Sequence, residues 1–213
     1  YSKTMQLEAL EGLEIVELGI LVLVAKPVED IFPNRVLEFT ESVASVVSGD
    51  LDGDGDADLA VLNNYSECCG RVSILLSRGD GTFAAQVEYY VENALSIALG
   101  DLDRDGDADL VVGNYGINAV SVLLNHGDGT FADYADYAAG TDPYSVAVRD
   151  LDGDGAADLA VANRRSNTVS VLLNHGDGTF ADHVQYGVES LPLSVALDDL
   201  DRDGDADLVV ATG

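Results

Sequence analysis

The sequence of 213 residues has no tryptophan and one methionine, and its only two cysteines, Cys68 and Cys69, are adjacent. Adjacent cysteines cannot form the disulfide framework of a small secreted domain, so they do not indicate a redox compartment. Three interpretations of the pair stay open: an accidental pair in a surface loop, which we favour, a free thiol pair, and a strained vicinal disulfide. The lack of tryptophan counts against a lectin, although nine tyrosines supply surfaces for stacking.

Basic residues are also scarce, because 10 Lys and Arg stand against 39 Asp and Glu, a formal charge of -29. Such a surface repels phosphate, so we expect divalent cations rather than nucleic acid or anionic membranes as partners. The longest apolar run, Leu18 to Ala25, is too short to span a bilayer and suits a buried strand. We therefore expect no insertion into a membrane. No Ser/His/Asp arrangement stands out in the sequence, so we do not expect an enzyme either.

What the chain does contain is a repeat. DLDGDGDADL at Asp50 returns as DLDRDGDADL at Asp101, DLDGDGAADL at Asp150 and DLDRDGDADL at Asp199, at intervals of 51, 49 and 49 residues. A second motif, RGDGTF or HGDGTF, follows the first three copies and ends at Phe83, Phe131 and Phe180. Self-similarity at a fixed period of about 50 residues indicates a repeat architecture.

Each repeat predicts four short strands separated by turns. In the third copy, residues 144–148 form the first strand, 158–163 the second and 168–174 the third; FADYADY (131–137) illustrates the fourth. Four strands rich in β-branched residues within about 50 residues make one propeller blade. We expect an all-β propeller with an N-terminal segment (1–42), three repeats (43–92, 93–142 and 143–190) and the first half of a fourth (191–213), together one domain.

The acidic stretch between the first two strands predicts a calcium loop. Counting Asp50 as position one, positions one, three, five and nine are Asp in every copy and position six is Gly. Position four varies freely, and position seven is Ala156 in the third copy, as expected if that position serves through its backbone carbonyl. A solvated acidic loop gives no reason for this pattern.

Calcium suits a flexible set of oxygen donors better than magnesium does, and zinc or copper would want the His or Cys that these loops lack. We therefore expect about four Ca²⁺. The predicted ligands are Asp50, Asp52, Asp54, Asp56 and Asp58; Asp101, Asp103, Asp105, Asp107 and Asp109; Asp150, Asp152, Asp154, Ala156 and Asp158; and Asp199, Asp201, Asp203, Asp205 and Asp207.

Together DLDGDGDADLAVLN, VSVLLNHGDGTF and SVAV resemble FG-GAP/VCBS repeats, as in the integrin α-subunit propeller and many bacterial surface proteins. The resemblance covers residues 43 to 213. It implies a β-propeller with calcium in the hairpin loop between the first two strands of each blade, at the extracellular or cell surface. That family usually closes with about seven blades, more than this chain supplies.

Ring closure has three possible forms. The segments 21–25 and 34–39 align with the third and fourth strands of a repeat, so the N-terminus is expected to complete the last blade and close a ring of four, which hides edge strands. The alternatives are part of a seven-bladed propeller, or an open array whose chain ends pair between molecules.

The expected function is a non-catalytic binding or adhesion module for protein or glycan. One alternative is a structural subunit of a self-assembling surface filament, and another is the scaffold of a secreted carbohydrate-active enzyme. Asn64, in the sequon NYS, is a possible glycosylation site on an extended loop. The Arg78-Gly79-Asp80 tripeptide occupies a turn that reads HGD in the next two copies, so turn geometry explains it.

Overall fold

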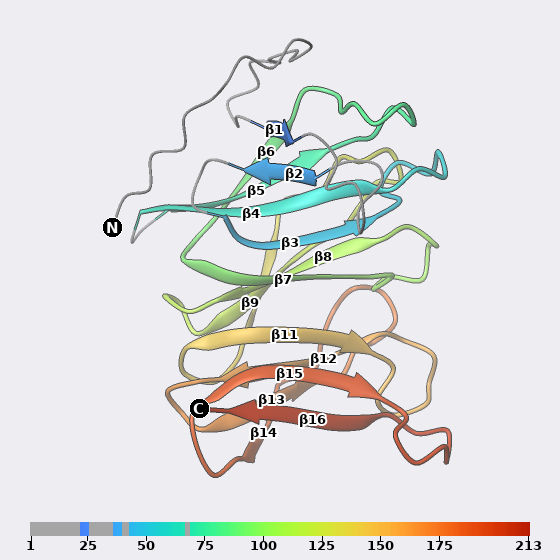
Figure 1. Cartoon of the computed structure of the whole chain (residues 1–213). Helices are drawn as coiled ribbons and strands as arrows, with labels where there is room; N and C mark the ends of the chain where they lie inside the picture. The colour runs from blue at the N-terminus through green and yellow to red at the C-terminus, as the bar shows by residue number, and fades with distance from the viewer. Residues whose placement is uncertain (1–21, 26–35, 40–42, 67–68) are drawn as a thin grey trace. The chain divides into compact units, whose positions relative to one another are not determined.

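The computed structural model describes residues 22–25, 36–39, 43–66 and 69–213, which fall into two compact units, 1–42 and 43–213 (Figure 1). In the first unit, β1 (Val22–Ala25) and β2 (Val36–Phe39) pair antiparallel. The expectation that these segments are neighbouring strands is confirmed for the described residues. The expected strand positions 21, 34 and 35, and the state of Cys68, lie outside them.

The second unit contains three four-stranded antiparallel sheets and one two-stranded hairpin. Each sheet follows the order of the chain, so every repeat folds as one blade. Blade 1 comprises β3 (Val43–Gly49), β4 (Asp58–Ser66), β5 (Cys69–Leu75) and β6 (Val87–Val91); blade 2 comprises β7 (Ala94–Gly100), β8 (Asp109–Asn114), β9 (Ala119–Leu123) and β10 (Ala135–Ala138); blade 3 comprises β11 (Pro143–Arg149), β12 (Asp158–Asn163), β13 (Thr168–Leu172) and β14 (Val184–Gly187); the hairpin comprises β15 (Pro192–Asp198) and β16 (Asp207–Thr212).

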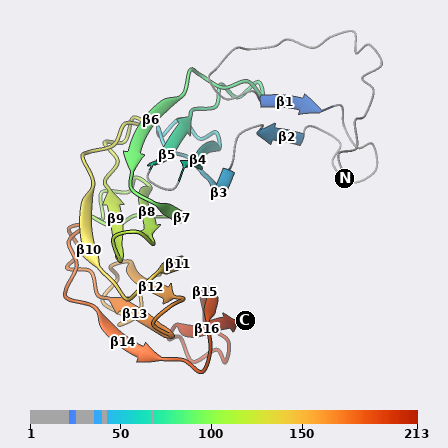
Figure 2. The same cartoon turned by 90° about the vertical axis from the view of Figure 1, so that its left-hand side faces the viewer.

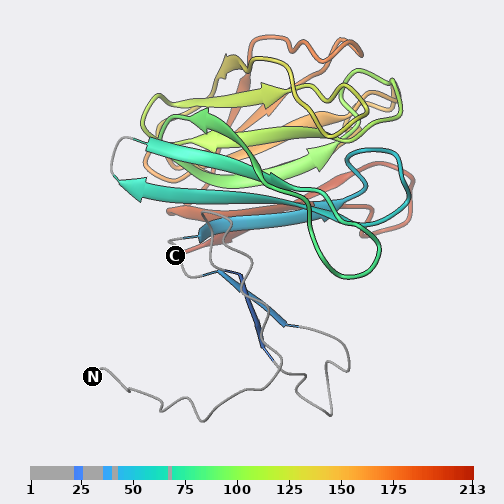
Figure 3. The same cartoon turned by 90° about the horizontal axis from the view of Figure 1, so that it is seen from above.

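Within this unit the blades follow one another along an arc (Figure 2). The first strands β3, β7, β11 and β15 lie on its inner side and contact one another in that order, whereas β6, β10 and β14 lie outside. Because neighbouring strands are antiparallel, the loops from first to second strands all emerge at one end of the sheets (Figure 1, Figure 3). The acidic loops are therefore gathered on one face of the arc.

The core lies between the blades rather than within any one of them. Leu62 and Ile74 of blade 1 pack against Leu110 and Val112 of blade 2. A second cluster joins blade 2 to blade 3 in the same way, and both faces of each central strand are buried. Continuous apolar runs such as LAVA (159–162) are what strands covered on both faces require.

Two local features differ from the sequence expectations, and a third, the Arg78-Gly79-Asp80 turn, agrees with them. Strand four starts at Ala135 in blade 2 rather than at Phe131, because Phe131 makes only an isolated bridge with Asn125 and inserts its ring into the core. Asn64 lies within β4 and pairs with Gly70, not in a loop, because that hairpin extends the strand beyond its counterparts. The Arg78-Gly79-Asp80 turn is exposed, and Asp80 accepts hydrogen bonds from Thr82.

The fourth hairpin exposes side chains that the other blades bury. Leu200 is 63% exposed and Val209 45%, whereas their counterparts in blade 2, Leu102 and Val111, are fully buried. Among the described strands, β15 and β16 form a sheet of their own, as do β1 and β2. The union of these two hairpins in one blade, and with it the four-blade ring and the single domain, stays a prediction.

Candidate functional site

Each acidic loop brings carboxylates together at the end of its hairpin. One oxygen from each of three side chains lies within 4.8 Å of the other two. Positions one, three and nine form this group in the first three loops, and positions one, three and five form it in the fourth. The members are Asp50, Asp52 and Asp58; Asp101, Asp103 and Asp109; Asp150, Asp152 and Asp158; and Asp199, Asp201 and Asp203.

Hydrogen bonds inside the loop hold these carboxylates in place. The two oxygens of Asp50 accept from the backbone N–H groups of Gly53 and Gly55, at 2.9 and 3.0 Å. Position three accepts from the N–H of position five, and position five accepts from that of position seven. Position six has a positive φ, +89° at Gly55, which glycine adopts without strain. The same pattern recurs at Asp150, Gly153 and Gly155.

The aspartate at position nine also has a structural role. It lies buried at the start of strand two, where its side chain accepts hydrogen bonds from backbone N–H groups. In blade 2, Asp109 Oδ2 accepts from Leu102 N at 2.8 Å and Oδ1 accepts from Asn125 N at 2.7 Å. Asp58 and Asp158 make the corresponding bonds in their own blades. This side chain fastens the acidic loop to the end of strand three, while each oxygen keeps a lone pair for a cation.

Burial and the neighbouring carboxylates raise the pKa values of several loop aspartates, so a bound cation would stabilise their charged forms. Burial, and secondarily the nearby carboxylates of Asp103 and Asp105, raises the pKa of Asp109 to about 6. The pKa of Asp158 is raised for the same main reason. The pKa of Asp52 is also raised, by burial and then by neighbouring aspartates. A carboxylate that is costly to ionise beside like charges is stabilised by a bound cation.

Position four is not free, in contrast to the sequence expectation. Its backbone is left-handed in all four loops, including the two that carry arginine: φ is +64° at Arg104 and +67° at Arg202. A side chain at such a φ is uncommon. Position seven tolerates Ala156, whose N–H donates to Asp154 as that of Asp56 donates to Asp54. Ligation through the position-seven carbonyl stays a prediction.

Two asparagines connect neighbouring blades and were missed in the sequence. The amide of Asn125 donates to the carbonyl of Leu51 in blade 1 at 2.9 Å and to that of Ala108 in its own loop at 3.0 Å. Asn174 repeats these bonds one blade further on. The only sequence signal was the Asn before HGDGTF in two copies, where the first copy has Ser77. These bonds position each acidic loop against the next blade.

The loops fit calcium chemically. Their donors are oxygens alone, three carboxylates converge in each loop, and the neighbouring backbone N–H groups are already bonded to those carboxylates. Hard cations prefer such ligands, and calcium accepts more of them, in less regular geometry, than magnesium does. The residues present therefore can hold a divalent cation.

The opposite end of the sheets carries a polar hollow of about 340 Å³ between blades 2 and 3. Asp142 forms its buried part and pairs with Arg164 Nε at 2.8 Å and with Arg165 Nε at 3.5 Å. Tyr115 supplies an aromatic surface, and the remaining lining comes from Gly116, Asn118 and Thr141. An aromatic ring beside hydroxyl, amide and guanidinium groups suits a small polar ligand.

The fold and the loops define a class: a repeat protein of propeller blades, each with an acidic loop that can hold a metal ion. The sequence profile of the FG-GAP-like repeat matches residues 50–112, 101–161 and 150–210. The chain belongs to the FG-GAP-like repeat family. No curated protein matches it. None of the described residues forms a helix long and apolar enough to cross a bilayer.

Solved structures share the fold at low sequence identity. A functionally unknown protein from Desulfotomaculum acetoxidans has a TM-score of 0.58 and 17% identity, over 92% of this chain and 56% of that one. The Tc holotoxin pore of Photorhabdus luminescens has a TM-score of 0.50 and 21% identity, over 98% of this chain and 11% of that one. The chain thus spans about half of one of these relatives and a small part of the other.

Proposed function

We propose that this protein is a calcium-stabilised, non-catalytic β-propeller module that binds a protein or glycan partner outside the cell. The observation that carries the proposal is the fourfold convergence of three carboxylate oxygens within 4.8 Å. Left without a cation, each pair of charges at ~4 Å costs roughly 1 kcal/mol even in water. Bound calcium removes this cost and fixes the loops at one end of the blades.

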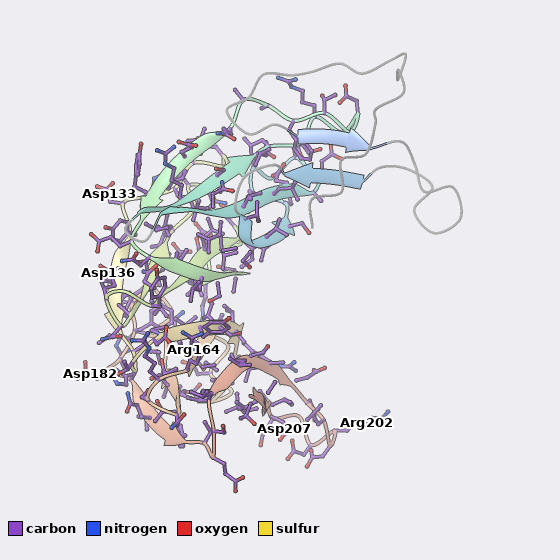
Figure 4. The ribbon with its side chains drawn as sticks, turned by 60° about the vertical axis from the view of Figure 1, so that its left-hand side comes forward. Asp133, Asp136, Arg164, Asp182, Arg202 and Asp207 are labelled. Atoms are coloured by element: carbon purple, nitrogen blue, oxygen red, sulfur yellow. The ribbon has the colours of Figure 1, made fainter. Side chains whose placement is uncertain are left out.

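The first test counts the ions. Native mass spectrometry of the full chain in calcium should show mass additions of up to four calcium ions that disappear in EDTA. Asp152→Asn should lower the count by one, because it removes a carboxylate from the third group. The same substitution at Asp133, an exposed residue outside the loops (labelled in Figure 4), should leave the count unchanged. Identical spectra in calcium and EDTA would contradict the proposal.

The polar hollow is the proposed place of ligand contact. Its buried Asp142 holds two arginines in position, and Arg165, whose side chain is 73% exposed, remains accessible to a ligand. A glycan array probed with the labelled chain tests this, with Tyr115→Ala as the hollow variant. Tyr186→Ala removes an exposed tyrosine from β14 and serves as control. Signals that Tyr115→Ala leaves unchanged would place ligand contact elsewhere.

A structural role in an assembly is the second candidate. It is favoured by the exposed apolar side chains of the fourth hairpin, since Leu200 and Val209 occupy positions that the next blade covers elsewhere. Such a face promotes contact with a further blade, within one molecule or between molecules. Light scattering of the intact chain separates the candidates, because a filament grows with concentration and a closed module does not.

A further inference from the structure

The acidic loop of blade 3 receives a cation from blade 2. The guanidinium of Arg104, at position four of the second loop, donates from Nη2 to Asp154 Oδ1 and to the Asp154 carbonyl, both at 3.0 Å. These two residues are 50 positions apart and lie in the acidic loops of neighbouring blades. The contact therefore joins two candidate metal loops directly.

The Arg104 side chain also lies against the first glycine of the GDGT turn of blade 3, where blades 1 and 2 have the position-seven aspartate of their own loop. A Cβ built on Gly79 would lie 2.4 Å from Asp56 Oδ2, and one on Gly127 would lie 2.3 Å from Asp107 Oδ2. In blade 3, the corresponding Gly176 has Arg104 Cζ as its nearest neighbour, at 3.1 Å. Position seven of that loop is alanine, so the side chain beside the glycine turn comes from the preceding blade.

The neighbouring interface shows the alternative arrangement. Position four of the first loop is Gly53, and a Cβ there would lie 3.8 Å from the Gly127 carbonyl of blade 2. Position four of one loop thus faces the glycine turn of the next blade at both interfaces. Glycine is paired with aspartate at position seven of the next loop (Gly53 with Asp107), whereas arginine is paired with alanine (Arg104 with Ala156).

The left-handed backbone of Arg104 strengthens this correspondence. Its φ of +64° is one that glycine adopts more readily, as Gly53 does with +74°. Arginine at this position carries a backbone cost that glycine avoids, and its two hydrogen bonds to the next loop offset that cost. The ion pair is half-exposed, with side-chain exposures of 44% and 50%, so its effect is local and sensitive to salt.

We propose that Arg104 is an inter-blade positioning residue that supplies part of the positive charge of the third acidic loop and thereby lowers the calcium affinity of that loop. Asp154 is the position-five carboxylate, and the metal group of this loop consists of Asp150, Asp152 and Asp158. A guanidinium on Asp154 repels a divalent cation at that group. The calcium part of the inference rests on the proposed function.

Nuclear magnetic resonance of the full chain resolves the four loops. The position-six glycines, Gly55, Gly106, Gly155 and Gly204, each donate their amide to the first aspartate of their own loop, so each amide reports one site. In Arg104→Gly, the calcium midpoint of Gly155 should fall about tenfold, the effect of removing a unit charge ~5 Å from a divalent ion. Glycine suits the backbone there.

Arg202→Gly is the matched control, because it makes the same change at position four of the fourth loop. It should leave the Gly155 midpoint unchanged. A shift of Gly106 alone in Arg104→Gly, with Gly155 unmoved, would overturn the inference, since it would confine the arginine to its own loop. Figure 4 shows Arg202 pointing away from its hairpin.

A second measurement needs no calcium. In calcium-free buffer, the change in Tm caused by Arg104→Gly should be more negative in the wild-type background than in Asp154→Asn, by about 1 °C or more. The control pair is Arg104→Gly with Asp54→Asn, the position-five residue of the first loop, whose effects should add. Additive effects for Asp154→Asn as well would overturn the inference. If no glycine responds to calcium, the proposed function fails, and this cycle still decides the role of Arg104.

Discussion

The side-chain amide of Asn174 donates to the backbone carbonyl of Leu102 at 2.7 Å, across 72 residues and one blade boundary. Leu102 is position two of the second acidic loop, and the same amide also reaches Ala157 in the third loop at 2.9 Å. One buried side chain thus sets the distance between two candidate metal loops. Asn125 has the same relationship with Leu51.

Replacing Asn174 with alanine should destabilise the protein by about 1–3 kcal/mol, because the buried carbonyl of Leu102 and the partly buried carbonyl of Ala157 lose their donor. Asn125→Ala should cost a similar amount. Ser77→Ala is the control, since that hydroxyl accepts a hydrogen bond from Gly79 in an exposed turn. Urea unfolding of the three variants measures the differences, and a loss for Ser77→Ala as large as for Asn174→Ala would contradict the assignment.

The two kinds of aspartate in one loop should respond differently in the absence of calcium. Asp109→Ala should lower stability in EDTA by about 1–3 kcal/mol, because it leaves the buried N–H groups of Leu102 and Asn125 without an acceptor. Asp103→Ala should lower stability only in calcium, since its carboxylate serves the metal group. Thermal unfolding with and without EDTA separates them. Equal losses in EDTA would show that position nine has no structural task.

Lowering the pH should have opposite effects with and without calcium. The pKa of Asp109 is raised from 3.8 to about 6 in the folded protein by burial. The folded state therefore binds this proton more tightly than the unfolded state, and the stabilisation is lost as the pH rises through about 6. In calcium-free buffer the Tm should rise between pH 7 and pH 5, and in calcium it should fall as the ligands become protonated.

The variant Asp109→Asn serves as the control for this titration, because its side chain stays neutral throughout. Its calcium-free Tm should rise less on acidification than that of the wild type. A wild-type Tm that falls with pH in both buffers would contradict the electrostatic account of the loops.

The blade and its acidic loop were predictable because the chain contains its own alignment. Four copies keep Asp at positions one, three, five and nine, and three copies keep the glycine turn, so strand order and candidate ligands follow from spacing alone. The structure brings positions one and three together in every loop. Local pattern specifies these features because they form within one hairpin.

Contacts between blades were not predictable in the same way. Arg104 meets Asp154 only because two blades pack side by side, and nothing in the second loop indicates what its fourth residue will face. The variation at position four suggested freedom, whereas its backbone is left-handed with arginine as well as with glycine. The predicted start of strand four was too early, because apolar and polar residues already alternate in FADYADY from Phe131. The chain pairs with β9 only from Ala135 onward.

Removal of residues 1–42 tests ring closure. If β1 and β2 complete the fourth blade within one molecule, the deletion should expose the hydrogen-bonding edge of β16, and the product should aggregate or unfold. If they pair between molecules, the intact protein should form fibres and the deleted form should be soluble. Light scattering on both forms distinguishes these outcomes. Unchanged size and stability would exclude both forms of closure.

Calcium-dependent unfolding tests the central claim most directly. With a Kd of ~10 µM, about 1 mM calcium stabilises by roughly 2.7 kcal/mol per site, and four independent sites give about 11 kcal/mol. That sum is comparable with the whole stability of a typical domain, roughly 5–15 kcal/mol. The Tm measured by circular dichroism should therefore be at least about 10 °C higher in calcium than in EDTA, with a smaller gain in magnesium. A Tm that is the same in calcium and in EDTA would contradict the account.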